Sequence, residues 1–155
     1  QGDLEGALKI YKESREVSER LAKSDPSNAT WQRDLSVSLD NIGEVLSAQG
    51  GLEGALKIYK ESREVRERLA KSDPSNATWQ RDLSYSFTSL ALCYEKQGNL
   101  SEARHHAEES LAIDERLSVH DPTNAVWKRD VAFSRTQAER LRNLADKVVG
   151  LGENS

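Results

Sequence analysis

The sequence has few of the features that mark secreted or membrane-bound proteins. Its single cysteine, Cys93, excludes an intramolecular disulfide, so we expect a reducing, cytoplasmic environment. No apolar run approaches the roughly 20 residues that a membrane-spanning helix needs, and no signal-peptide pattern opens the chain. The sequence therefore predicts a protein that neither crosses a membrane nor carries a secretion signal.

Hydrophobic residues are also scarce, at 36%, whereas charged residues make up 31%. This balance is typical of long solvated helices or of an elongated structure with a high surface-to-volume ratio. The formal net charge is -4, and it favours binding neither to nucleic acid nor to an anionic membrane. We therefore expect neither of these as a partner.

Proline is rare as well, and its placement reveals an internal repeat. The three prolines lie 48 residues apart, at Pro26, Pro74 and Pro122. The three tryptophans keep the same step, at Trp31, Trp79 and Trp127. Residues 4–17 recur unchanged as 52–65, and residues 19–36 recur unchanged as 67–84. A fixed period of this size indicates stacked supersecondary units.

Each repeat is predicted to hold two helices. Apolar side chains follow Trp31 at steps of three or four residues, which keeps them on one face of a helix. This helix should end at Gly50, where glycine can adopt the left-handed cap, and the next should end before Pro74. Asn28 and Asn76 then stand where an N-cap is needed. We expect an all-α structure with almost no β-structure and six antiparallel helices, at residues 3–24, 29–49, 52–72, 77–97, 100–120 and 125–147.

The spacing of these residues resembles the tetratricopeptide repeat (TPR) family. One match to the family pattern is formed by Leu39, Ile42, Gly43, Leu46, Ala55, Tyr59 and Ser62. A second is formed by Phe87, Leu90, Ala91, Tyr94, Ala103, Ala107 and Ser110. The resemblance implies an α-α superhelix, a TPR-like solenoid that acts as a scaffold for protein binding.

The repeat is longer than the usual unit of 34 residues. Both helices lengthen by about seven residues, close to two helical turns, so the apolar face stays in phase. Long repeats of this kind resemble those of kinesin light chains and of bacterial TPR arrays. We predict one repeat domain over residues 1–149, divided into a partial unit 1–25, full units 26–73 and 74–121, and a C-terminal capping helix 122–149.

The two ends of the chain are expected to differ. The last helix carries Arg135 and Arg142 where the earlier ones have apolar residues, which is typical of a terminal cap with a polar outer face. The first helix resembles the second half of a unit, so we expect the chain to belong to a longer array. Residues 150–155 are expected to form a flexible tail.

The resemblance also implies a concave groove lined by the first helix of each unit. The groove residues implied in this way are Arg33, Val37, Asp40, Glu44, Arg81, Tyr85, Thr88, Leu92, Arg129, Phe133, Thr136 and Arg140. An apolar row of Val37, Tyr85 and Phe133 is a candidate contact surface, although these side chains could equally pack against neighbouring helices. The arginines could likewise form ion pairs between units.

The sequence therefore predicts a binding protein. We expect a protein or peptide partner in the groove, of unknown identity, as in the sensor or adaptor part of a larger bacterial-type protein. The alternative is that the chain is a self-assembly or oligomerisation module of a larger multidomain signalling protein. No activated nucleophile or acid–base pair emerges, so we expect no enzyme activity and no cofactor. His105 and His106 diverge by about 100° on a helix, so we expect no metal site.

Overall fold

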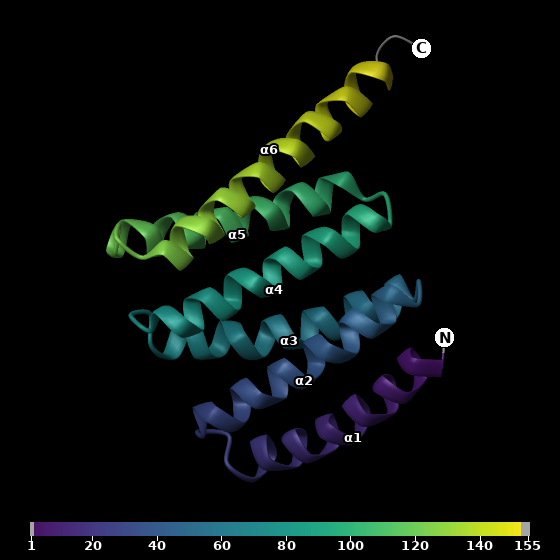
Figure 1. Cartoon of the computed structure of the whole chain (residues 1–155), viewed down its shortest axis with the longest axis vertical. Helices are drawn as coiled ribbons and strands as arrows, with labels where there is room; N and C mark the ends of the chain where they lie inside the picture. The colour runs from purple at the N-terminus through teal and green to yellow at the C-terminus, as the bar shows by residue number, and fades with distance from the viewer. Residues whose placement is uncertain (1, 153–155) are drawn as a thin grey trace. The chain divides into compact units, whose positions relative to one another are not determined.

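The computed structural model describes residues 2–152, and every element in this range is an α-helix (Figure 1). The six helices are α1 (Gly2–Ser24), α2 (Ala29–Ala48), α3 (Leu52–Ser72), α4 (Ala77–Lys96), α5 (Leu100–His120) and α6 (Ala125–Gly152). The predicted all-α helical-repeat fold is confirmed. Every predicted helix end agrees with the structure to within one residue, except the end of α6.

The helix α6 is longer than the sequence indicated. It continues to Gly152, three residues into the segment that we expected to be a tail. A glycine inside a helix costs only about 1 kcal/mol relative to alanine, so Gly150 weakens the helix without ending it. The rest of the expected tail, residues 153–155, lies outside the described residues.

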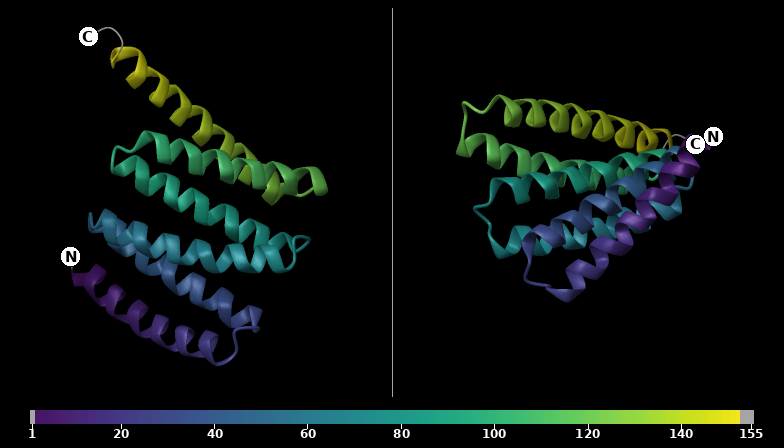
Figure 2. Two further views of the ribbon diagram at one scale, coloured as in Figure 1. Left: turned by 180° about the vertical axis from the view of Figure 1, so that it is seen from behind. Right: turned by 60° about the horizontal axis from the view of Figure 1, so that its bottom comes forward.

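The chain forms two compact units, residues 1–79 and residues 80–155, and each is described by itself. In the first unit, α2 packs against both α1 and α3. In the second unit, α5 packs against α6, and side-chain hydrogen bonds join α4 to α5. Consecutive helices within each unit run antiparallel, as both views in Figure 2 show.

The three proline corners are built alike. At the second corner, Asp73 Oδ1 accepts hydrogen bonds from the backbone N–H of Ser75 at 3.0 Å and from its hydroxyl at 2.6 Å. Asn76 Oδ1 then accepts the backbone N–H three residues later, at 3.1 Å, and so caps α4. The same bonds recur at the other two corners. The three prolines therefore occupy equivalent corners, which agrees with the 48-residue repeat of the sequence.

Glycine makes the corners at the opposite ends of the helices. Gly50 and Gly98 have φ angles of 81° and 78°, in the left-handed region that glycine adopts without steric cost. The backbone N–H of the residue after each glycine reaches back to the preceding helix, to Leu46 at 2.8 Å and to Tyr94 at 2.9 Å. These bonds satisfy the last carbonyls of α2 and α4.

The core of the first unit explains the glycine of the family pattern. Leu39 and Ile42 of α2 pack with Ile58 of α3 in a buried cluster. Beside them, a Cβ atom at Gly43 would lie 2.6 Å from Cε1 of the buried Tyr59 ring. Because real Cβ atoms essentially never approach so closely, any larger residue at position 43 would require the Tyr59 ring or the helices to shift.

The two arginines that suggested a terminal cap both reach from α6 to α5. Arg135 pairs with Glu115 at 2.8 Å, and Arg142 pairs with Glu108 at 3.1 Å. Both arginine side chains are about half exposed, so these pairs contribute little stability on their own. That α6 is a cap remains a prediction.

Candidate functional site

Several of the predicted groove residues surround a hollow within the second unit. The hollow has a volume of about 360 Å³ and is lined by residues of α4, α5 and α6. Five of its lining residues were predicted from the sequence: Arg81, Tyr85, Thr88, Leu92 and Phe133. The other five were not: Asp82, Ser84, Asp114, Asp130 and Ser134. We call this hollow the Asp114 pocket.

Large apolar side chains form the rim of the Asp114 pocket. Tyr85 and Leu92 project from α4, and Phe133 projects from α6. Tyr85 is 47% exposed and Phe133 is 56% exposed, so both rings present much of their surface to solvent. An exposed apolar rim around a polar hollow is typical of a protein-binding surface.

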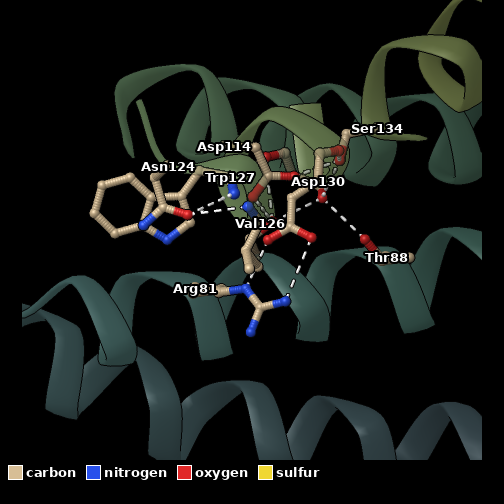
Figure 3. Close-up of polar contacts among 10 residues, drawn as sticks. Arg81, Thr88, Asp114, Asn124, Val126, Trp127, Asp130 and Ser134 are labelled. Atoms are coloured by element: carbon tan, nitrogen blue, oxygen red, sulfur yellow. Dashed lines mark hydrogen bonds and ion pairs between the residues drawn. The ribbon is translucent and has the colours of Figure 1, made fainter. Parts of the chain in front are cut away.

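A buried carboxylate forms the floor of the pocket. Asp114 of α5 is only 4% exposed. The hydroxyl of Ser84 donates to its Oδ1 at 2.6 Å. The hydroxyl of Ser134 donates to its Oδ2 (Figure 3). Burial raises the pKa of Asp114, and the two serine hydroxyls oppose this change because they stabilise the ionised form.

A chain of hydroxyl groups surrounds Asp114 and ties the three helices together. Ser110 Oγ lies 3.0 Å from Ser84 Oγ and 2.9 Å from Thr88 Oγ1. It also lies 3.5 Å from Ser134 Oγ. Each hydroxyl has one proton to donate and two lone pairs to accept with, so the network fixes the orientation of the carboxylate.

Arg81 closes one side of the pocket. Its Nε donates to Asp130 Oδ2 at 2.6 Å, and its Nη2 lies 3.4 Å from Asp130 Oδ1 (Figure 3). The hydrogen bond to Asp130 raises the pKa of Arg81. The alternative that the groove arginines form ion pairs between repeat units therefore holds for Arg81.

A second ion pair lies further along the same two helices. Arg140 of α6 donates to both carboxylate oxygens of Glu95 of α4, with Nη2 2.7 Å from Oε2. This pairing lowers the pKa of Glu95, chiefly through the hydrogen bond from Arg140. Arg140, predicted as a groove residue, is thus exposed but engaged within the second unit.

In the first unit, the prediction that Asp40 lies on an open groove face is wrong. Its side chain is buried and forms an ion pair with Arg66 of α3. Arg66 Nε also donates to Ser36 Oγ at 3.1 Å. Position 66 is the repeat equivalent of Asp114, so the two repeats carry opposite charges at one buried position. This reversal is readable in the sequence and was the signal that could have identified Asp114.

The remaining groove residues differ in their exposure. Val37 and Glu44 of α2 are exposed, and Arg33 is half-buried. On α6, Arg129 and Thr136 are exposed, and the hydroxyl of Thr136 donates to its own helix at Ala132 O, 2.8 Å away.

Two other side chains of reactive types, those of His106 and Cys93, are buried in the helical core. His106 is buried, and its ring stacks on Phe87 and Tyr94 with centroid distances of 5.8 and 5.4 Å. Cys93 is buried, and burial raises the pKa of its thiol. Across the part of the chain that the structure describes, no three His, Cys, Asp or Glu side chains gather in a way that could hold a metal ion. Within the same part, no helix combines the length and apolar character needed to span a membrane.

Comparisons with known proteins agree with this architecture. In its fold, the chain is similar to the crystal structure of BtubC (BKLC) from P. vanneervenii, with a TM-score of 0.65 and 20% sequence identity. The match covers 93% of this chain and 51% of that protein, so this chain spans about half its length. No curated protein matches the sequence. A family model described as "Tetratricopeptide repeat" matches residues 34–116, which is more than half of the sequence, and the chain therefore belongs to the tetratricopeptide repeat family.

Proposed function

We propose that this chain is a protein-interaction scaffold that binds a peptide or protein partner at the Asp114 pocket. The observation that carries this proposal is the exposed apolar rim around a hollow with a polar floor. The tetratricopeptide repeat family generally mediates interactions between proteins, and this general role supports the proposal.

The energetics of the rim favour binding. Aromatic side chains such as Tyr85 and Phe133 offer large contact areas at a small cost in conformational entropy. Both are attached to helices that pack against α5, so little ordering is needed when a partner covers them. A partner that buries these two rings and Leu92 would gain most of its binding energy there.

Within the second unit, the proposed surface around the pocket includes the other exposed residues predicted for the groove. In the second unit, these are Arg129 and Thr136 of α6, with Arg140 held in its pair with Glu95. In the first unit, taken by itself, we propose a separate contact surface on α2, formed by the exposed Val37 and Glu44 and the half-buried Arg33. Asp40 is left out because it is buried against Arg66.

The test is the affinity of a purified partner for the intact chain and for two variants. Tyr85→Ala and Phe133→Ala should each weaken binding by about tenfold or more, since truncating an interface hot spot costs about 2 kcal/mol. Val119→Ala is the matched control, because Val119 is an exposed apolar residue of α5 outside the pocket. Unchanged affinity in both variants, with helicity intact by circular dichroism, would contradict the proposed site.

Self-association through α1 is a second candidate. Ile10, Val17 and Leu21 follow one face of α1 and are all exposed. Their repeat equivalents in α3, Ile58, Val65 and Leu69, are all buried. The exposed face of α1 is therefore suited to packing against another helix, such as one from a second copy of the chain.

A further inference from the structure

We propose that the Asp114 pocket receives a positively charged side chain, a lysine or an arginine, from the partner. This inference rests on the proposed function and specifies the chemistry of the partner.

The charges that line the pocket favour a cation. Three carboxylates, those of Asp82, Asp114 and Asp130, face the hollow with one guanidinium, that of Arg81. Arg81 already donates to both oxygens of Asp130. An anionic ligand would have to displace this pair and would then meet the two other carboxylates, whereas a cation meets an excess of negative charge.

The floor of the pocket is prepared for a further donor. Each oxygen of Asp114 accepts one serine hydroxyl, from Ser84 and from Ser134. A carboxylate oxygen can accept about two hydrogen bonds, so both oxygens keep acceptor capacity. The serines also fix the orientation of the carboxylate before a ligand arrives, which lowers the entropic cost of binding.

The first unit shows how this chain neutralises a buried carboxylate between the equivalent pair of helices, α2 and α3. There, Asp40 of α2 is buried, and Arg66 of α3 donates to its Oδ2. In the second unit, the equivalents of Asp40 and Arg66 are Thr88 and Asp114. In the second unit, the carboxylate therefore lies on α5. It occupies the position that the internal arginine holds in the first unit. A lysine or arginine of the partner would supply the charge that Arg66 supplies in the first unit.

The rim suits the rest of such a side chain. Lysine and arginine carry a long aliphatic stem below the charged group, and this stem packs well against apolar surface. Tyr85 and Phe133 offer that surface on opposite sides of the pocket, from α4 and α6. The faces of such aromatic rings also attract a cation.

The experiment compares two capped pentapeptides by nuclear magnetic resonance on the intact, ¹⁵N-labelled chain. One has a central lysine between glycines, and the other has norleucine, which keeps the stem but lacks the charge. The lysine peptide should shift the amide signals of Thr88 and Ser134 in a saturable way, and at least five times more tightly than the norleucine peptide. Hydrogen bonds between charged groups contribute only a small net free energy when a single side chain binds. We therefore expect a dissociation constant of about 1 mM or below.

Two variants assign the effect to the pocket floor. Asp114→Asn keeps the shape of the side chain but removes its charge. It should weaken the affinity for the lysine peptide about tenfold and leave the affinity for the norleucine peptide unchanged. Glu115→Gln is the matched control, because it removes the same charge from an exposed neighbouring residue outside the pocket. If Asp114→Asn alters the helicity, Phe133→Leu is the second variant; it keeps an apolar rim, removes the ring face and should reduce the preference for lysine.

The outcomes separate this inference from the proposed function. Equal binding of the two peptides, or no saturable shift with lysine up to about 10 mM, would overturn the inference. In that case, a partner whose affinity still falls with Tyr85→Ala would continue to support the proposed function. Conversely, selective binding of the lysine peptide, together with a partner whose affinity is unchanged by Tyr85→Ala, would support the inference and contradict the proposed function.

Discussion

At the scale of single residues, the two repeats show a compensating pair of substitutions. In the first unit, Gly43 of α2 faces the ring of Tyr59. In the second unit, the equivalent positions hold Ala91 and Ala107, and both are buried. A methyl group on the first helix is thus found where the tyrosine ring is absent. The first helix therefore carries a side chain where no tyrosine ring lies opposite it, and glycine where the ring is present.

This pair predicts an unfavourable Gly43→Ala substitution. Overpacking a closed core costs about 1–3 kcal/mol, and the better helix propensity of alanine returns only about 1 kcal/mol of that. We expect a lower free energy of unfolding, measured by urea denaturation. In a Tyr59→Ala background, the same substitution should no longer destabilise the protein.

The control for this prediction is Gly54→Ala in α3. A Cβ atom there would meet Leu46 at 3.5 Å, an ordinary contact. This variant should therefore gain about 0.5–1 kcal/mol from helix propensity alone. A Gly43→Ala protein as stable as the Gly54→Ala protein would show that the Tyr59 ring moves aside freely.

A second residue-scale prediction concerns the pH dependence of stability. Burial raises the pKa of Asp114 above the ordinary 3.8, against the opposing effect of Ser84 and Ser134. The charges that face it are Arg81 on α4 and Asp130 on α6, which act in opposite directions. Between pH 3.8 and the raised pKa, the folded protein binds more protons than the unfolded chain, so this group lowers stability as the pH rises.

Asp114→Asn should remove this dependence. Relative to the parent chain, the variant should gain stability as the pH is raised from about 4 to about 7, by about 1.4 kcal/mol for each unit of pKa shift. Urea denaturation at a series of pH values measures the difference. A constant difference across this range would show that the folded chain holds Asp114 at its ordinary pKa.

The residues of the pocket divide according to what a sequence can reveal. Tyr85, Phe133 and Arg81 were predicted because an open helix face follows from helical periodicity and the family pattern. Asp114 was missed because its burial depends on serines from α4 and α6 that are distant in the sequence. Asp40 was wrongly placed on the surface for the same reason, since its partner lies on another helix.

At the scale of elements, the helices were more predictable than the site because their ends are encoded locally. An asparagine cap, a proline or a left-handed glycine acts within one turn of the helix that it limits. The end of α6 lacks such a signal before Gly150, and there the prediction failed.

The glycine corner between α4 and α5 provides a test at this scale. Gly98 has a φ of 78°, and a Cβ atom at this position would lie in open space, so backbone strain is the main effect of a side chain. Gly98→Ala should destabilise the chain by about 1–2 kcal/mol in thermal or urea denaturation. Gly98→Asn should be less damaging, because asparagine tolerates the left-handed region. Equal losses for the two variants would point to a cause other than the backbone angle.

At the scale of the whole molecule, one sequence occurs in two environments. Residues 4–17 of α1 and 52–65 of α3 are identical. Ile10 is nevertheless 64% exposed, whereas its equivalent Ile58 is 8% exposed and packs with Leu39 and Ile42 of α2. The energetic role of this isoleucine is therefore set by whether another helix covers it, and not by its local sequence.

This contrast predicts different outcomes for the same substitution at the two positions. Ile58→Ala should cost about 2–5 kcal/mol in the free energy of unfolding, because it opens a cavity in a packed core. Ile10→Ala should change stability by less than about 0.5 kcal/mol in a monomer, since it removes an exposed side chain. If the chain self-associates through α1, Ile10→Ala should instead lower the stability at high protein concentration and shift sedimentation towards the monomer. A concentration-independent loss at Ile10 as large as that at Ile58 would mean that the face of α1 is covered within a single chain.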